Sequence, residues 1–137
     1  MTITYTTDMS GVDFEVLRQV LIDDDFHNGR TAEQYRLSAE NSHTCVIAYD
    51  GARIVGNARM FSDGVCNAYI VDVWTHSSYR RRGIATEMMR ILERQAQGQH
   101  ICLWTDDAQP FYERIGYRRS RDTLYEKVVG QWLRNKE

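Results

Sequence analysis

Two Asp-Gly pairs, at positions 50–51 and 63–64, constrain the fold of this chain more than any other feature of the sequence. They separate three runs that are rich in apolar and β-branched residues: HTCVIAY at 43–49, RIVGNARMF at 53–61 and CNAYIVDVWT at 66–75. Asp-Gly between such runs is typical of a tight hairpin turn, because glycine readily takes the positive φ that the turn requires. The sequence therefore predicts three consecutive antiparallel strands in the middle of the chain.

Helical and extended patterns flank this meander. Phe14, Leu17 and Leu21 recur at helical spacing, and Thr31 is a suitable N-cap for a second short helix. We expect helices at 11–22, 31–39, 83–96 and 108–115, and further strands at 2–6, 101–104, 117–121 and 124–129. The strand, helix, strand order after the meander favours parallel pairing of its two strands. The predicted fold class is therefore α/β with a mixed central sheet.

Charge and composition exclude several classes of function. The net charge is -2 and the pI is about 6.1, whereas a nucleic-acid binder usually carries a strongly basic face. Hydrophobic residues make up 42% of the 137 positions, enough for one core, and we expect a single domain over 1–137. The N-terminus lacks a signal-peptide pattern, and no run approaches the roughly 18 apolar residues of a membrane helix. We expect a cytoplasmic protein that binds neither nucleic acid nor membranes.

The cysteines and the acidic residues give no metal signature. Cys45, Cys66 and Cys102 lack the C-x-x-C spacing of a zinc or redox site, and their apolar neighbours favour small buried thiols. The acidic triplet at 23–25 lacks ligand spacing with His27, so we expect no bound metal. We interpret the triplet as a solvated acidic turn, with attraction of a cationic amine as the alternative.

Positive charge gathers at one place, YRRRGIATEMM at 79–89, where three arginines precede the predicted start of a helix. The first N–H groups of a helix have no intrahelical acceptor, and the helix dipole adds positive charge there, so such a start binds phosphate well. Gly83 would let an anion approach the backbone, and Ala85 keeps the next turn thin. On these residues alone, a phosphate site and a solvated loop with a turn glycine are equally good interpretations.

Two spaced motifs resemble those of the GNAT superfamily of acetyl-CoA-dependent N-acetyltransferases. RRRGIA at 80–85 fits the family's Q/R-x-x-G-x-G/A element, and AQPFYERIGY at 108–117 is similar to its A-x-x-F-Y-E-x-x-G-F/Y element. The resemblance covers essentially the whole chain. It implies a mostly antiparallel sheet of six or seven strands with a splayed parallel pair, flanked by about four helices. It also implies transfer of an acetyl or other short acyl group from acetyl-CoA to the primary amine of a small molecule or peptide.

The resemblance assigns the coenzyme A site to two segments. In many family members the strand before the arginines bulges, and its backbone pairs with the pantetheine amides; here this falls on Val73, Trp74 and Thr75. In the family, backbone amides at the helix start bind the pyrophosphate, which here means Arg81 through Thr86, with Arg80 and Arg82 near the phosphates. The residues implied there are Arg80, Arg81, Arg82, Gly83, Ile84, Ala85 and Thr86. Thr105 departs from the family's common asparagine, which puts a side-chain contact to the coenzyme at that position in doubt.

Two residues are candidates for catalysis. Direct attack on a thioester needs a neutral amine, although a lysine-like amine has a pKa of about 10.4, and the departing thiolate benefits from a proton donor. Tyr112 matches the family position of that general acid; the alternative is a core tyrosine with a satisfied hydroxyl. Asp72 interrupts an apolar strand and is either a general base, an anchor for the amine, or an acceptor of structural hydrogen bonds. His76 is a weaker candidate, which we expect in an exposed loop.

The acceptor and the assembly stay open at this stage. A polyamine, an amino acid, an antibiotic and a protein terminus all fit, and the chain could act alone or as a homodimer. Two other functions compete: a non-catalytic coenzyme A-binding sensor or partner module, and a nucleotide or nucleic-acid adaptor that uses the arginine cluster. The presence of both Tyr112 and Asp72 argues against the first, and the acidic net charge argues against the second.

Overall fold

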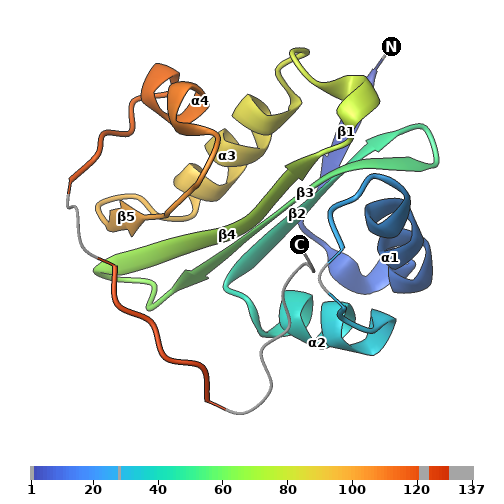
Figure 1. Ribbon diagram of the computed structural model, residues 1–137, viewed down its shortest axis with the longest axis horizontal. Coiled ribbons are helices and arrows are strands. Elements are labelled where there is room, and N and C mark those ends of the chain that lie inside the picture. The colour runs from blue at the N-terminus through green and yellow to red at the C-terminus, as the bar shows by residue number, and fades with distance from the viewer. Residues whose placement is uncertain (1, 28, 121–123, 130–137) are drawn as a thin grey trace.

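A mixed five-stranded sheet forms the centre of the protein in the computed structural model, which describes residues 2–27, 29–120 and 124–129 (Figure 1). The strands lie in the order β1-β2-β3-β4-β5, and every neighbouring pair is antiparallel except the parallel pair β4 and β5. Their bounds are β1 Ile3–Thr6, β2 Thr44–Asp50, β3 Arg53–Ser62, β4 Asn67–Thr75 and β5 His100–Cys102. The predicted meander and the mixed α/β class are confirmed.

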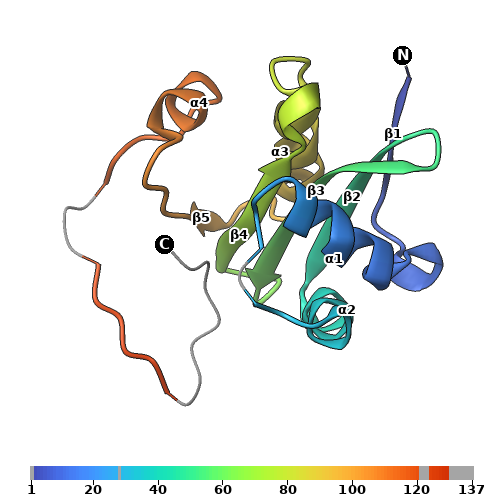
Figure 2. The same ribbon diagram turned by 45° about the vertical axis from the view of Figure 1, so that its right-hand side comes forward.

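Helices cover both faces of this sheet (Figures 1 and 2). In the described part of the chain, the α-helices are α1 Phe14–Asp23, α2 Ala32–Asn41, α3 Ile84–Arg94 and α4 Gln109–Arg114, and the 3-10 helices are η1 Met9–Gly11 and η2 Ser77–Tyr79. The α3 helix lies on one face, and α1 and α2 lie on the other (Figure 2). Since β2 and β3 are covered on both sides, their residues are buried in continuous runs rather than in alternation.

Two apolar clusters hold the layers together. Under α3 the buried side chains include Val46, Val55, Met60, Met88 and Leu92, and under α1 and α2 they include Leu17, Leu21, Ile47, Ile54 and Trp74. Burial of each such side chain stabilises the fold by about 1.5–3 kcal/mol. Close packing of Met88 from α3 requires glycine at position 56, because a Cβ there would lie 3.0 Å from Met88 Sδ and 3.0 Å from Ala48 Cβ of β2.

Side-chain caps fix the starts of the first two α-helices. Asp13 accepts hydrogen bonds from the backbone amides of Glu15 and Val16 at the start of α1. Thr31 and Gln34 form a reciprocal capping box at the start of α2, which confirms Thr31 as an N-cap. Each cap is worth about 1 kcal/mol.

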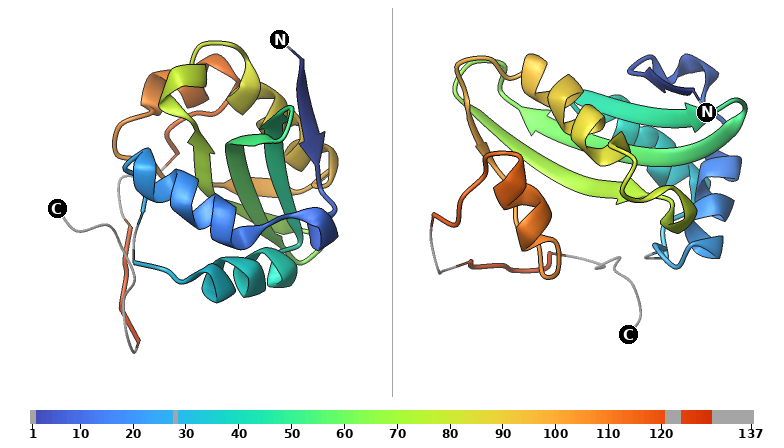
Figure 3. Two further views of the ribbon diagram at one scale, coloured as in Figure 1. Left: turned by 90° about the vertical axis from the view of Figure 1, so that its right-hand side faces the viewer. Right: turned by 90° about the horizontal axis from the view of Figure 1, so that it is seen from above.

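The two strands expected after α4 are not part of the sheet. Residues 117–120 and 124–129 have irregular backbone, and residue 121 lies outside the described residues. At Tyr117 the chain is still bound to the preceding helix, since its amide donates to Tyr112 O at 2.9 Å and its hydroxyl donates to Glu93 at 2.8 Å. Residues 124–129 are exposed and lie apart from the sheet (Figures 1 and 3). The described sheet therefore has five strands instead of the expected six or seven.

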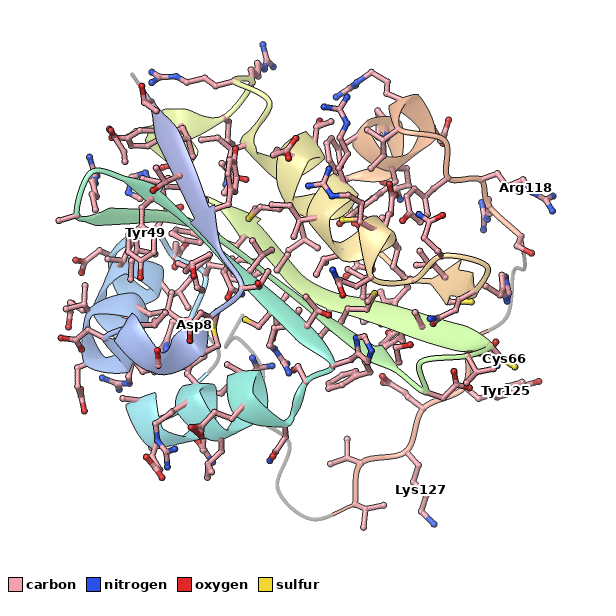
Figure 4. All side chains as sticks on the ribbon, turned by 180° about the vertical axis from the view of Figure 1, so that it is seen from behind. Asp8, Tyr49, Cys66, Arg118, Tyr125 and Lys127 are labelled. Carbon is pink, nitrogen blue, oxygen red and sulfur yellow. The ribbon has the colours of Figure 1, made fainter. Side chains whose placement is uncertain are left out.

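The prediction of three buried thiols is correct only for Cys45. That thiol is buried under α1 and α2, and burial raises its pKa to about 12. Cys66 is exposed in the turn between β3 and β4, and Figure 4 shows it at the tip of that hairpin. Cys102 is exposed on the edge strand β5. Apolar neighbours in the sequence do not bury a residue at a turn or on an edge strand, because the rest of the protein does not surround the chain at such positions.

Candidate active site

The strand β4 carries a β-bulge in its second half. Between Val71 and Trp74, two residues of β4 lie opposite one residue of β3. One of the two, Asp72, has a φ of +55°, in the left-handed region that costs a non-glycine residue about 1–2 kcal/mol. Bulges of this kind bend a strand and re-aim the side chains around them, and they are common beside active sites.

The parallel pair β4 and β5 is splayed, as the family resemblance implies. Pairing is confined to residues 67–69 and 100–102, after which the chain turns toward α4 (Figure 1). In the described part of the chain, no strand covers the β5 side of residues 70–75. At the end of this edge, Thr75 Oγ1 is buried and no described residue hydrogen-bonds it. A free strand edge with an orphaned hydroxyl suits a ligand that carries amides, such as a pantetheine arm.

The loop from β4 to α3 is anchored by Tyr79. The tyrosine is buried, and its hydroxyl donates to Asp50 Oδ2 at 2.6 Å. The guanidinium of Arg53 lies 5.3 Å from the centre of the ring, and that of Arg82 lies 5.2 Å from it. Arg80 stays exposed. The middle of the loop is therefore fixed by a buried aromatic side chain, with arginines on the outside.

Left-handed backbone forms the start of α3. Arg81 has a φ of +63° and the N-cap Gly83 a φ of +81°, and a Cβ added to Gly83 would meet no atom within 4 Å. The amide of Glu87 donates to Gly83 O at 3.0 Å, so the three preceding amides, 84–86, have no acceptor within the helix. Unpaired amides beside left-handed residues are the components of an anion site, and open space at Gly83 lets the anion reach them.

Tyr112 lies on α4 and packs against the cluster under α3. Its ring forms edge contacts with Phe111 at 5.0 Å and with Tyr117 at 5.9 Å between centroids. Burial, and to a lesser extent the charge of Asp107, raises the pKa of Tyr112, so the phenol is protonated at neutral pH. No described residue accepts from or donates to its hydroxyl, which leaves a proton donor without a fixed partner among those residues.

Asp72 is paired with two arginines. Its Oδ2 atom accepts from Arg30 Nη1 at 2.7 Å, from Arg59 Nη2 at 2.7 Å and from Arg59 Nε at 3.1 Å. Burial alone would raise the pKa of Asp72, but the two guanidiniums outweigh it and hold the pKa below its ordinary value. The backbone carbonyl of Asp72 also accepts from Asn57 Nδ2 at 3.0 Å. The carboxylate is thus ionised and held in place at neutral pH.

Sequence reasoning missed both arginine partners of Asp72. Arg59 interrupts an apolar run in the same way as Asp72 does, and the two runs were predicted to be neighbouring strands. Opposite charges on paired strands were therefore a usable signal for Arg59. Arg30 lies in the loop between α1 and α2, 42 positions from Asp72, and no local pattern links the two.

The expectation of a solvated acidic turn at 23–25 is wrong for Asp24. Its side chain is only 6% exposed. The carboxylate accepts from Trp74 Nε1 at 2.9 Å, from the Ser77 amide at 3.0 Å and from the Ser77 hydroxyl. Burial raises the pKa of Asp24, but these hydrogen bonds and the nearby His76 together lower it below its ordinary value. The end of α1 is consequently tied to the end of β4 and to the loop before α3.

His76 is also less exposed than expected. Its side chain is 13% exposed and lies in edge contact with the rings of Trp74, at 6.0 Å, and Tyr79, at 5.9 Å. Its Nδ1 accepts from the Ser78 amide at 3.1 Å, which caps η2. His76 therefore orders the loop between β4 and α3.

Metal-ligating clusters and membrane-spanning helices are absent from the described part of the chain. Over 2–27, 29–120 and 124–129, no three His, Cys, Asp or Glu side chains are placed to hold a metal ion. Within those ranges, no helix has both the length and the apolar character needed to cross a bilayer.

Comparison with known proteins identifies the family. The profile of the Acetyltransferase (GNAT) family matches residues 14–117, which is most of the chain. The protein belongs to the GNAT acetyltransferase family. No match is found among curated protein sequences. The matched GNAT region contains β4, the start of α3 and Tyr112, so the bulged strand and the left-handed loop both lie inside it.

Solved structures of known or proposed acetyltransferases share the fold. A proposed GNAT acetyltransferase from Xanthomonas campestris is 26% identical, with 94% of each chain covered and a TM-score of 0.79. A proposed acetyltransferase from Deinococcus radiodurans is 25% identical, with 91% of this chain and 88% of that chain covered and a TM-score of 0.75. A predicted acetyltransferase from Clostridium acetobutylicum, solved with acetyl-CoA, is 22% identical, with 92% of this chain and 96% of that chain covered and a TM-score of 0.68.

The GNAT site residues expected from the sequence lie on two sides of β4. Val73 and Tyr112 pack against the cluster under α3, and the start of α3 follows on the same side through η2. Trp74 packs into the cluster under α1 and α2, and Asp72 meets Arg30 from the loop between these helices. The structure thus places Val73, the start of α3 and Tyr112 on the α3 side of β4, whereas Trp74 and Asp72 contact groups on the α1 and α2 side.

Proposed function

We propose that this GNAT protein transfers an acetyl, or another short acyl, group from acetyl-CoA to a primary amine by direct attack within a ternary complex. The observation that carries the proposal is the bulged and splayed second half of β4, which leads directly into the left-handed start of α3. Family membership supports the acyl-transfer chemistry. We further propose that residues 1–137 act as one cytoplasmic domain, as the sequence predicts.

The donor would bind along the backbone. The amides of residues 84–86, with Gly83 and Arg81 before them, would donate to the pyrophosphate, and Arg80 would add charge from outside. The open edge of β4 at residues 73–75 would pair with the pantetheine amides. The Thr75 hydroxyl, which no described residue hydrogen-bonds, fits this assignment because a bound polar group would satisfy it.

The transfer step needs an oxyanion site and a proton donor. The amine nitrogen attacks the thioester carbonyl, the C–N bond forms, and the C–S bond then breaks. An amide at the bulge, that of Val73, would stabilise the negative oxygen in between. The Tyr112 hydroxyl would protonate the departing thiolate, and its raised pKa keeps that proton in place until then.

Among the roles left open for Asp72, the geometry favours orientation. A carboxylate held by two guanidiniums, with a lowered pKa, is a weak acceptor of the amine proton at neutral pH. We therefore propose that Asp72 fixes Arg30 and Arg59 beside the acceptor, and that water carries the amine proton away.

Two measurements test this function. Thermal melting with acetyl-CoA should show stabilisation of about 2.7 kcal/mol at 100 times Kd, whereas ATP and a short oligonucleotide should give none. An amine panel, followed by thiol release from acetyl-CoA, should then identify turnover. Stabilisation without turnover of any amine would support the coenzyme A-binding module instead, and no stabilisation by acetyl-CoA would end the proposal.

A further inference from the structure

Three arginines and one aspartate gather on the α1 and α2 side of β4. Besides Arg30 and Arg59 on Asp72, Arg18 of α1 contributes through its Nε, which donates to Arg30 O at 3.0 Å. Tyr35 lies among them, with the guanidinium of Arg30 5.7 Å from the centre of its ring. Two guanidiniums pair with the one carboxylate and a third lies against the Arg30 backbone, so positive charge is in excess in this cluster although the chain as a whole is acidic.

The two partners of Asp72 are engaged to different degrees. Arg59 uses all its nitrogens: Nε and Nη2 on Asp72, and Nη1 on Ser42 Oγ at 3.1 Å and Ser38 O at 3.5 Å. Arg30 bonds Asp72 through Nη1, and in the described residues nothing accepts from its Nε or Nη2. The Arg30 side chain is 20% exposed, against 10% for Arg59. Arg59 therefore acts as a support, and Arg30 presents free donors to solvent.

The cluster lies beside the position where the reaction is proposed. Asp72 directly precedes Val73 at the bulge, and Arg30 reaches it from the loop between α1 and α2. Excess positive charge in partly buried surroundings is unfavourable unless an anion compensates it, and a guanidinium edge binds carboxylate or phosphate in a bidentate way. Positive charge also favours the neutral form of a nearby amine, which is the form that attacks a thioester.

We propose that the acceptor is an anionic amine, a small molecule whose carboxylate or phosphate binds Arg30 while its primary amine lies at the bulge. This inference rests on the proposed acetyl transfer. The same cluster repels acceptors that carry only positive charge, such as polyamines. Arg30 sets the specificity, and Asp72 and Arg59 hold it in position.

Matched acceptors test the inference by thiol release from acetyl-CoA. One arm compares ethanolamine phosphate with ethanolamine, and the other compares β-alanine with its carboxamide, so that the arms separate phosphate from carboxylate. We expect kcat/KM to be about tenfold or more higher for the anionic member of at least one pair, as loss of a charge-assisted hydrogen bond implies. Equal values in both pairs, or a preference for spermidine, would overturn it.

Substitutions test whether a preference for anionic acceptors comes from the arginine cluster. Arg30→Gln should bring the ratio of kcat/KM between the anionic and the neutral acceptor of the preferred pair close to one, mainly by raising KM for the anionic acceptor. Arg30→Lys should restore part of this ratio. Arg36→Gln is the matched control, since Arg36 lies exposed on α2 and pairs with Glu33 and Glu40; it should leave the ratio unchanged. If the folded Arg30→Gln variant keeps the wild-type ratio of kcat/KM values, Arg30 does not bind the anionic group of the acceptor.

Melting temperatures of wild type with coenzyme A give a readout that needs no turnover. The anionic member of at least one of the two pairs should raise the melting temperature more than its neutral partner, and Arg30→Gln should remove the difference. If acetyl-CoA binds but no amine releases thiol, the proposed function fails, and this melting difference still decides whether an anion site exists. Absence of the difference in wild type rejects the site.

Discussion

Asp72 and Arg59 lie opposite in charge on neighbouring strands, with Arg59 Nη2 2.7 Å from Asp72 Oδ2, at the position where β4 bulges away from β3. The side chain of Asp72 is 19% exposed and that of Arg59 is 10% exposed. A pair so little hydrated is costly to break, because the partner left behind keeps its charge without compensation.

Removal of the Asp72 charge should therefore destabilise the fold. We expect Asp72→Asn to lower the free energy of unfolding by about 2–3 kcal/mol, since asparagine tolerates the left-handed backbone and only the charge is lost. Urea unfolding of Asp72→Asn, Arg59→Met and the double variant measures the coupling. Additive effects of the two single changes would show that the pair is not a unit.

The stability of the protein should fall at acid pH partly through Asp72 and Asp24. Both have pKa values below the ordinary value in the folded protein, so each contributes stability that is complete above the unfolded pKa of about 3.9 and is lost as the pH falls through the folded pKa. Unfolding free energies measured from pH 6 down to pH 2 should fall more steeply below pH 4 in wild type than in Asp72→Asn. Parallel curves for the two proteins would contradict this.

Asp72→Asn should also leave the shape of the rate profile unchanged above pH 6. A carboxylate with a lowered pKa is already ionised there, so the rate should follow the acceptor amine in both proteins. Values of kcat/KM measured from pH 6 to pH 9 check this. A rate loss that grows toward low pH would instead make Asp72 the general base.

Tyr112→Phe should lower kcat by about a hundredfold while leaving the Kd of acetyl-CoA nearly unchanged, because in the proposed mechanism the hydroxyl acts only as the thiolate forms. Tyr117→Phe is the matched control. Its hydroxyl donates to Glu93 at 2.8 Å, so the change should cost stability and spare kcat. Equal kcat values for wild type and Tyr112→Phe would remove Tyr112 from the mechanism.

Gly83→Ala should weaken acetyl-CoA binding beyond its effect on stability. Gly83 and Gly98 both have positive φ, +81° and +76°, and both have open space where alanine would place its methyl group, so alanine should cost each site about 1–2 kcal/mol of stability. Only at Gly83 would the methyl group point into the proposed pyrophosphate site. Calorimetric titration should show a raised Kd for Gly83→Ala and an unchanged Kd for Gly98→Ala.

Local patterns in the sequence predicted the parts of the fold that local chemistry determines. The Asp-Gly turns, the Thr31 cap and the helix after Gly83 each depend on residues within a few positions, and all were found as expected. The strands after α4 failed because β propensity does not supply a partner, and Tyr117 instead holds the chain to α4 and α3.

The candidate site likewise combines features that local sequence patterns predict with contacts that only long-range packing creates. Its backbone features follow from a strand, a glycine and a helix start that are close in sequence. The contacts of Arg30 with Asp72 and of Asp24 with Trp74 join residues 42 and 50 positions apart, and they exist because the loop after α1 packs on β4. Nothing in either local pattern encodes that packing, so these side chains could be found only in the folded chain.

The left-handed backbone at Arg81 and Gly83 affects the entropy cost of binding the coenzyme. The turns of this loop are fixed by the fold, since Tyr79 is packed and its hydroxyl donates to Asp50. Little conformational entropy then has to be lost when the coenzyme associates, because folding has already met that cost. The proposed donor site is therefore preorganised, so we expect coenzyme association to be limited by diffusion and orientation instead of by loop rearrangement.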